Sequence, residues 1–177
     1  MNESLIANHL GALAVCLTDR LSVTAPLSDS SRALLESLYF RGPMPATSLA
    51  AIAGLAQPSA QRALDKLRRQ GLVTWDAQGR SRPVSLTGEG RDRAEALVAL
   101  RDRVLRQATT ALSADEQATL APLLERMLAA LTTSAEDARH MCRFCDHALC
   151  NGPACPVGEK ARSLSCQTSE GDADDPA

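Results

Sequence analysis

Aromatic residues are scarce in this sequence. One Trp, one Tyr and two Phe make up 2% of the 177 residues, while 45% of the chain is hydrophobic and much of that fraction is Ala and Leu. Aromatic and β-branched residues favour strands, whereas Ala and Leu favour helices. The composition therefore argues against a sheet-dominated fold and predicts a mainly helical protein. The length allows one domain with a full core and one appendage.

Long apolar runs and catalytic constellations are also lacking. No hydrophobic run approaches the length of a membrane span, and no basic N-terminal segment precedes an apolar one as in a secretory signal. We therefore expect a cytoplasmic protein that does not associate with membranes. The sequence shows no pairing of a nucleophile with a general base, so we expect that the protein is not an enzyme.

The chain has little net charge, but its charges are unevenly distributed. The formal net charge is −2, yet residues 55–93 contain eight Lys and Arg against four Asp and Glu. The last eleven residues contain four acids and no base. A locally cationic segment in a weakly acidic chain indicates a protein that binds DNA through that segment.

The stretch Leu49–Thr87 has the pattern helix, turn, helix, hairpin. Small apolar residues give the first helix one buried face, and Gly54 can supply the left-handed conformation of a tight turn. Gln57 is the expected N-cap of the second helix. Pro58 would be the first residue of that helix, and Gly71 would end it. Two alternating segments around a turn at Asp76–Gly79 then predict a hairpin. The pattern is that of a mainly α fold with a small β-wing, the winged helix-turn-helix.

The predicted hairpin carries basic residues near its tip. Arg80 and Arg82 flank the turn, so the wing is expected to be basic and exposed. Pro83 on the return strand has no N–H, which predicts an edge strand with no ladder partner at that position. The second helix keeps its amide and basic side chains on the face opposite the core. Together these features predict a unit that reads DNA.

These residues resemble the MarR family of bacterial transcription regulators. The similarity lies in the run LxxxAGLxQPSAxRxLDKLRRQGLV, the hairpin after it, and the LTGEG segment at Leu86–Gly90, and it extends over Leu5–Leu131. The resemblance implies an obligate homodimer on palindromic double-stranded DNA, with paired second helices in successive major grooves and each wing at a flanking minor groove. The resemblance implies that Ser59, Gln61 and Arg62 face base edges or phosphates, with Arg80 or Arg82 at the wing. The full set of predicted DNA-binding residues is Gln57, Ser59, Gln61, Arg62, Lys66, Arg80 and Arg82.

Helices on both sides of this unit carry apolar stripes. Residues 4–21 place large apolar side chains on one face, too much surface for a first helix to leave exposed. Thr87 is predicted to cap a helix that runs to about Ala111, and Ser113 to open another with an apolar stripe from Leu120 to Leu131. We expect these helices to hold two subunits together. The predicted domains are a dimerisation helix at 4–27, the winged helix-turn-helix at 28–88 and dimerisation helices at 89–139.

Four of the six cysteines lie within fourteen residues, with the spacing C-x2-C-x4-C-x4-C. They are Cys142, Cys145, Cys150 and Cys155. Thiolates gathered in this way repel one another until a cation neutralises them, so the spacing predicts a metal centre in residues 140–160. Residues 161–177 are predicted to form a flexible acidic tail.

An iron–sulfur cluster and zinc are the two candidates for this centre. Structural zinc usually takes two separated Cys-x2-Cys pairs and the chain has one, whereas bacterial ferredoxins end a compact run in Cys-Pro, as Cys155-Pro156 does. The loop is also similar to the C-x2-C-x-C-x5-C-P cluster loop of the SoxR redox sensors, with a different spacing. We predict an iron–sulfur cluster, with [2Fe-2S] preferred to [4Fe-4S]. The alternatives are Zn²⁺ and metal-free redox thiols, and His147 is a candidate substitute for one cysteine.

The combined features predict a homodimeric transcriptional repressor whose operator binding is tuned by the four-cysteine cluster acting as a redox or iron sensor. The expected route is a rotation of the dimer helices beside the cysteine loop, which changes whether both DNA-reading helices can enter their grooves. The alternative is a small-molecule-responsive regulator of the same fold. It would have a ligand cleft between the dimer helices and the DNA-reading domain, and a structural zinc in the cysteine loop.

Overall fold

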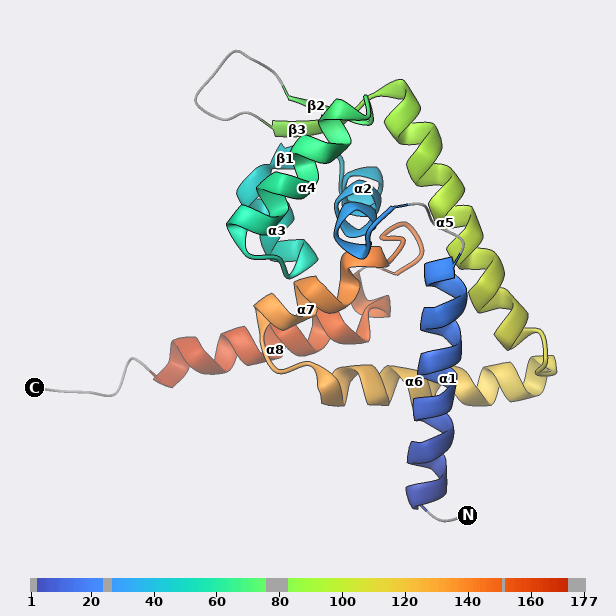
Figure 1. The fold of residues 1–177 in the computed structure, drawn as a ribbon. Coiled ribbons are helices and arrows are strands. Elements are labelled where there is room, and N and C mark those ends of the chain that lie inside the picture. The colour runs from blue at the N-terminus through green and yellow to red at the C-terminus, as the bar shows by residue number, and fades with distance from the viewer. Residues whose placement is uncertain (1–2, 24–26, 76–82, 151, 172–177) are drawn as a thin grey trace, which may run out of the picture.

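The computed structural model describes residues 3–23, 27–75, 83–150 and 152–171. Helices and three short strands follow one another along the chain (Figure 1). In order, the elements are α1 (Glu3–Val23), α2 (Asp29–Arg41), β1 (Met44–Pro45), α3 (Ala46–Ala53), α4 (Gln57–Arg69), β2 (Val73–Trp75), β3 (Pro83–Leu86), α5 (Gly88–Thr109), α6 (Ala114–Leu131), α7 (Ala135–Met141), the 3-10 turns η1 (Cys142–Phe144) and η2 (Gly152–Ala154), and α8 (Pro156–Gly171).

The winged helix-turn-helix is built around one hydrophobic core. Its centre consists of leucines from α2, α3 and α4 that are at most 1% exposed, namely Leu34, Leu35, Leu49, Leu64 and Leu67. The turn between α3 and α4 begins at Gly54, which adopts the left-handed conformation with φ 65°. The predicted fold class, mainly α with a small β-wing, is confirmed.

The three strands form an antiparallel sheet in the order β1-β3-β2. The prediction that Pro83 lies on an edge strand is wrong, because β3 pairs with β1 on one side and with β2 on the other. Pro83 is the first residue of β3 and lies opposite Pro45, so the two residues that lack an N–H face each other. The two-residue strand β1 had no recognisable pattern in the sequence.

Polar caps fix where the helices begin. The Thr87 hydroxyl accepts a hydrogen bond from the Gly90 N–H at 3.0 Å and donates one to the Gly71 carbonyl at 2.6 Å, so it caps α5 as predicted and ties it to the end of α4. The predicted start of α4 is wrong by one residue. Ala56 is the N-cap and Gln57 is the first helical residue.

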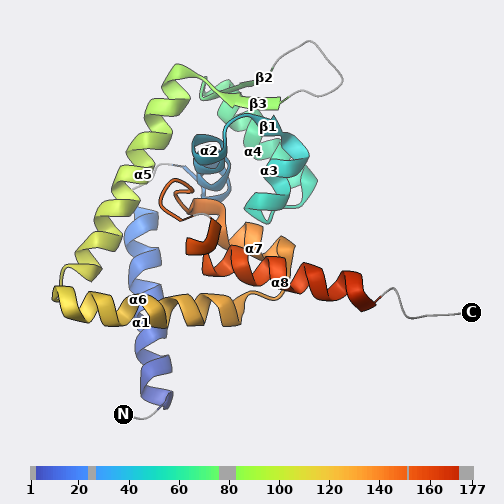
Figure 2. The ribbon, with the colours of Figure 1, turned by 180° about the vertical axis from the view of Figure 1, so that it is seen from behind.

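Helices α1 and α6 carry apolar faces that the single chain leaves exposed. Figures 1 and 2 show α1 continuing past α6, away from the winged helix-turn-helix. The exposed side chains are Leu5, Ile6, Leu10, Leu13 and Val15 in α1, and Leu123, Leu124, Met127, Leu128 and Leu131 in α6. None of the described helices combines the length and hydropathy required to cross a bilayer.

Helices α7 and α8 form a separate small core. Ala138, Cys142, Val157 and Ala161 are buried together there, and α8 also packs on α6. Residues 161–171, which belong to the predicted flexible tail, lie in α8, and this helix ends at Gly171. Its apolar residues were too few to mark a helix in the sequence, and the helix finds its partner only through the tertiary fold. Residues 172–177 lie outside the described part.

The start of α5 lies against the backbone that follows α4. A β-carbon added at Gly90 would stand 1.8 Å from the Leu72 carbonyl oxygen, whereas one added at Gly88 would meet nothing within 4 Å. We expect Gly90→Ala to lower the free energy of unfolding by roughly 3 kcal/mol, because the helix must move away from Leu72. Gly88→Ala is the matched control. Urea unfolding measures both, and equal stabilities of the two variants would contradict this close packing.

Candidate functional site

Helix α4 presents its polar side chains to solvent. Ala60, Leu64 and Leu67 face the core and Ala63 packs against it, whereas the polar residues between them lie mainly on the opposite face. Among the predicted DNA-binding residues, four are exposed and one is half-buried. The exposed ones are Gln57, Gln61, Arg62 and Lys66, and Ser59 is the half-buried one. Arg80 and Arg82 lie outside the described residues, so their predicted role stays a prediction.

Hydrogen bonds along α4 orient two of these side chains. The Gln61 amide nitrogen donates to the Asp65 carboxylate at 3.1 Å, and an Arg62 guanidinium nitrogen donates to the Ser59 hydroxyl at 3.4 Å. Both pairs have the three- or four-residue spacing that brings side chains together on a helix surface. The outer face of α4 therefore carries partly ordered amide and guanidinium groups.

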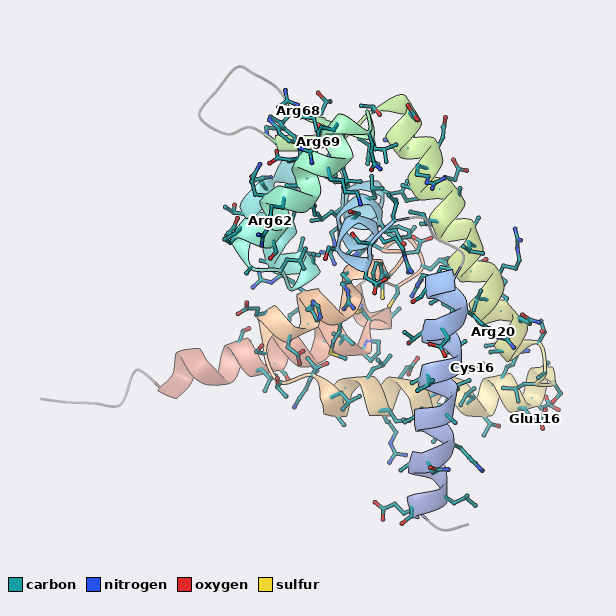
Figure 3. All side chains as sticks on the ribbon, in the orientation of Figure 1. Cys16, Arg20, Arg62, Arg68, Arg69 and Glu116 are labelled. Carbon is teal, nitrogen blue, oxygen red and sulfur yellow. The ribbon has the colours of Figure 1, made fainter. Side chains whose placement is uncertain are left out.

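The sequence prediction omitted two arginines in the last turn of α4. Figure 3 shows Arg62, Arg68 and Arg69 spaced along this helix. The Arg68 guanidinium lies over the Trp75 ring, 4.5 Å from its centroid, and Arg69 is exposed. The stacking contact holds one positive charge beside the first strand of the wing. The pair of basic residues before the helix end was the available signal, but such residues also occur there because they favour the helix dipole.

The four predicted ligand cysteines lie on the turns that connect α7 to α8. Cys142 opens η1 and is buried, Cys145 follows η1, and Cys150 precedes η2. Cys155 stands just before α8, where its sulfur accepts a hydrogen bond from the Gly158 N–H at 3.2 Å. This hydrogen bond ties the Cys155 sulfur to the first turn of α8.

The cysteines lie close enough to shift one another's pKa. A hydrogen bond between the Cys142 and Cys145 thiols raises the pKa of Cys142, and it lowers the pKa of Cys145 to about 6 against the opposing effect of burial. Burial raises the pKa of Cys150 to about 11, and the neighbouring Cys155 adds to that rise. The chain thus brings the four predicted thiols into one interacting group.

A cavity of about 550 Å³ lies beside this group. Its lining includes Cys142, Cys150, Cys155, His147, Arg41, Arg139 and Arg162. Arg41, the last residue of α2, donates from its Nη2 to the Cys142 carbonyl at 3.2 Å. Its buried Nε has no hydrogen-bond partner among the described residues. Sequence spacing could not have identified Arg41, because it lies 101 residues before Cys142.

These donors fit a metal centre bound by thiolates. In the part of the chain that the structure describes, no three His, Cys, Asp or Glu side chains are arranged so that they could hold a metal ion. The chemistry of the donor set is nevertheless suitable, because the buried Arg41 Nε–H is a donor that an anionic sulfur-rich centre would satisfy. Burial lowers the pKa of His147, which favours the neutral imidazole that metals bind.

The cysteine segment, by which we mean α7, α8 and the turns between them, packs mainly on the winged helix-turn-helix. Helix α7 contacts α3, and η1 contacts α2. In Figures 1 and 2 the chain after η1 curls beside α2, between α2 and α5. Helix α8 packs on α6, one of the helices predicted to join two subunits. The contact with α2 arises because the apolar ring of Phe144 packs against the core of the winged unit.

Several solved structures are similar to this chain in overall fold. A MarR family protein from Bacillus stearothermophilus is 22% identical and has a TM-score of 0.65, over 75% of this chain and 99% of its own. The fold is of the MarR type. MepR, a transcription regulator of the Staphylococcus aureus multidrug efflux pump MepA, is 19% identical with a TM-score of 0.61, over 74% of this chain and 99% of its own.

A probable transcriptional regulator from Pseudomonas aeruginosa is 28% identical with a TM-score of 0.50, over 67% of this chain and 96% of its own. No family model matches the sequence, and no curated protein matches it. The similarity to the MarR-type structures covers at most 75% of the chain in these three cases. The similarity therefore supports the fold. Any role of the cysteines has to be argued from the geometry of the site.

The lowered pKa of Cys145 predicts selective reactivity. In the reduced, metal-free protein, we expect the rate at which iodoacetamide labels Cys145 to rise with pH through a midpoint of about 6. The reason is that the Cys145 thiolate persists to lower pH than an ordinary thiolate does. Peptide mass spectrometry measures the labelling. Cys142→Ser should raise this midpoint by weakening the hydrogen bond, and an identical midpoint in folded and urea-unfolded protein would contradict the assignment.

Proposed function

We propose that this protein is a cytoplasmic, homodimeric transcriptional repressor that binds palindromic double-stranded DNA, with operator affinity tuned by an iron–sulfur cluster on four cysteines. The observation that carries the DNA-binding part is the outer face of α4, where exposed amide and basic side chains stand on the second helix of a MarR-type helix-turn-helix. An α-helix fits the major groove, and amide and guanidinium groups are the side chains that read base edges and phosphates there.

The homodimer is supported by the apolar faces of α1 and α6. Leu13 of α1 is 47% exposed and Leu131 of α6 is 65% exposed, and both belong to stripes of similar residues. Contiguous apolar surface of this extent marks an interaction site in a soluble protein. A second copy of the chain is the proposed partner, because two α4 helices about one helical turn of DNA apart are needed to occupy successive grooves.

The cluster is supported by the chemistry of the cysteine site. Cys142, Cys145, Cys150 and Cys155 would be its ligands, with [2Fe-2S] preferred. When bound, such a cluster supplies a redox couple whose potential depends on charge and hydrogen bonding around its sulfurs. The chain itself contributes the Arg41 donor, the α8 N-terminus at Cys155, and a position against both α3 and α6.

A second candidate is a small-molecule-responsive regulator with structural zinc in the cysteine loop. It is favoured by a cavity of about 290 Å³ where the end of α1 meets the start of α2 and η1, lined in part by Leu21, Arg32 and Phe144. This is the predicted position of a ligand cleft, between a dimer helix and the DNA-reading unit. Visible absorption of protein purified without oxygen separates the two candidates, because iron–sulfur clusters are coloured and a zinc site is not.

Removing one basic side chain from α4 should weaken DNA binding. We expect Arg62→Ala to raise the Kd for a duplex selected from a random pool about tenfold, and to reduce the salt dependence by about one ion per subunit if Arg62 contacts phosphate. Fluorescence anisotropy at several salt concentrations measures both. Arg103→Ala, an exposed site in the distal half of α5, is the control and should bind normally. A monomer that ignores every duplex would overturn the proposal.

Removing one ligand should abolish sensing without unfolding the dimer. We expect Cys145→Ser to lose iron and visible colour, and to lose the roughly 5- to 150-fold change in DNA affinity typical of such coupling. Cys166→Ser is the control, because Cys166 does not line the cavity. Iron and sulfide analysis and DNA binding of anaerobic protein measure these effects. An undiminished response in Cys145→Ser would contradict the cluster, and stoichiometric zinc in colourless protein would favour the second candidate.

A further inference from the structure

His140 packs directly on the turn of the helix-turn-helix. It lies on α7, two residues before Cys142, and its ring covers Gly54 between α3 and α4. A β-carbon at Gly54 would stand 2.4 Å from the His140 Cε1 and 2.5 Å from its Nδ1. The positive φ favours glycine at this position, and a β-carbon there would displace the His140 ring. The contact joins the cysteine segment to the start of α4.

A series of contacts continues from His140 to the core. An Arg143 guanidinium nitrogen lies 3.1 Å from the His140 Nε2, and it donates to the His140 carbonyl at 2.9 Å. The same guanidinium lies 4.8 Å from the centroid of the Phe144 ring. Arg32 of α2 and Arg101 of α5 flank that ring at 5.8 and 5.9 Å. The first cysteine pair is therefore anchored at the turn by His140 and at the core by Phe144.

We propose that the cysteine segment is a latch on the helix-turn-helix of its own chain, and that the His140–Gly54 contact transmits the state of the four thiols to α4. This inference rests on the proposed function. Cys142 immediately follows α7, so a change in its position relative to Cys145 moves the end of α7 that carries His140. The turn at Gly54 sets the direction in which α4 leaves α3. The route therefore acts within one subunit, in addition to any rotation between subunits.

The chemistry of the contact suits a releasable latch. The His140 Nδ1 is buried and has no hydrogen-bond partner among the described residues, so the ring is held on the turn by packing. Withdrawing the ring breaks no hydrogen bond at that atom and exposes it to water, which lowers the cost of release. By contrast, Phe144 is held by the core and by three guanidinium groups. The His140 end is therefore the one expected to move.

The test compares His140→Ala with Glu136→Ala, an exposed substitution on the same helix. Each full-length protein is prepared anaerobically, either reconstituted with ferrous iron and sulfide or reduced and metal-free, and its iron content is measured. Hydrogen exchange of the backbone amides at residues 53–57 and 59 reports on the turn, and fluorescence anisotropy reports DNA affinity. His140→Asn, which keeps a polar side chain but removes the ring, serves if the Ala variant melts at a lower temperature than the control.

Iron loading should slow exchange at the turn about fivefold in the wild type and in Glu136→Ala, and less than about twofold in His140→Ala. The His140 variants should still take up iron and bind DNA, but their loaded and metal-free affinities should agree within about twofold. Loading that changes wild-type DNA affinity without changing exchange at the turn would overturn the latch alone, as would a normal response in both His140 variants. Absence of iron uptake in the wild type would overturn the sensory function and the latch with it.

Discussion

The arrangement depends on one buried guanidinium. Glu36 is completely buried, and burial raises the pKa of its carboxyl group while the charge of Arg32 opposes that rise. The Arg32 Nε lies 3.5 Å from the Glu36 carboxylate, and its Nη1 donates to the Leu21 carbonyl at the end of α1 at 3.1 Å. A buried carboxyl group needs such a partner. Since Arg32 also flanks Phe144, it holds α1, α2 and η1 at a single point.

That junction gives a physical route by which the C-terminal segment can be coupled to the winged helix-turn-helix. A tail with no core contact would titrate, bind metal or oxidise without consequence for α4. Here Phe144 is inserted beside Arg32 and Arg101, and Arg41 at the end of α2 donates to the Cys142 backbone. The cysteine segment is therefore part of the same packed structure as the winged unit. Coupling between the two needs only a change in packing already present, not a new docking event.

The sequence predicted what local chemistry determines. Gly54 in the turn, Thr87 at its cap and the outward residues of α4 follow from spacing and side-chain type, and all are found where expected. It failed where long-range pairing decides. The two-residue strand β1 turns Pro83 from an edge into a central position, and α8 packs on α6 and α7, which lie at some distance from it in the sequence or across the cysteine turns.

The residues of the candidate site also fall into those that the sequence predicted and those that it did not. Four cysteines at close spacing were visible in the sequence as a group, because a short segment must wrap its own ligands. Arg41 and the contact between His140 and Gly54 were not, since each joins distant parts of the chain and neither residue type is unusual. Stacking of Arg68 on Trp75 is intermediate, because both residues belong to the predicted unit but their contact requires the wing to fold back on α4.

The first two cysteines and the last two adjoin elements that pack on different parts of the molecule. Cys142 and Cys145 adjoin η1, which packs on α2, and they follow α7, which packs on α3. Cys155 caps α8, which packs on α6. A centre that binds all four thiols would therefore fix the winged unit relative to the helix proposed to join the subunits. A centre held by one pair alone would constrain only one side. If the proposed centre forms, the spacing of the four cysteines across two turns would let its ligands reach both the winged unit and α8.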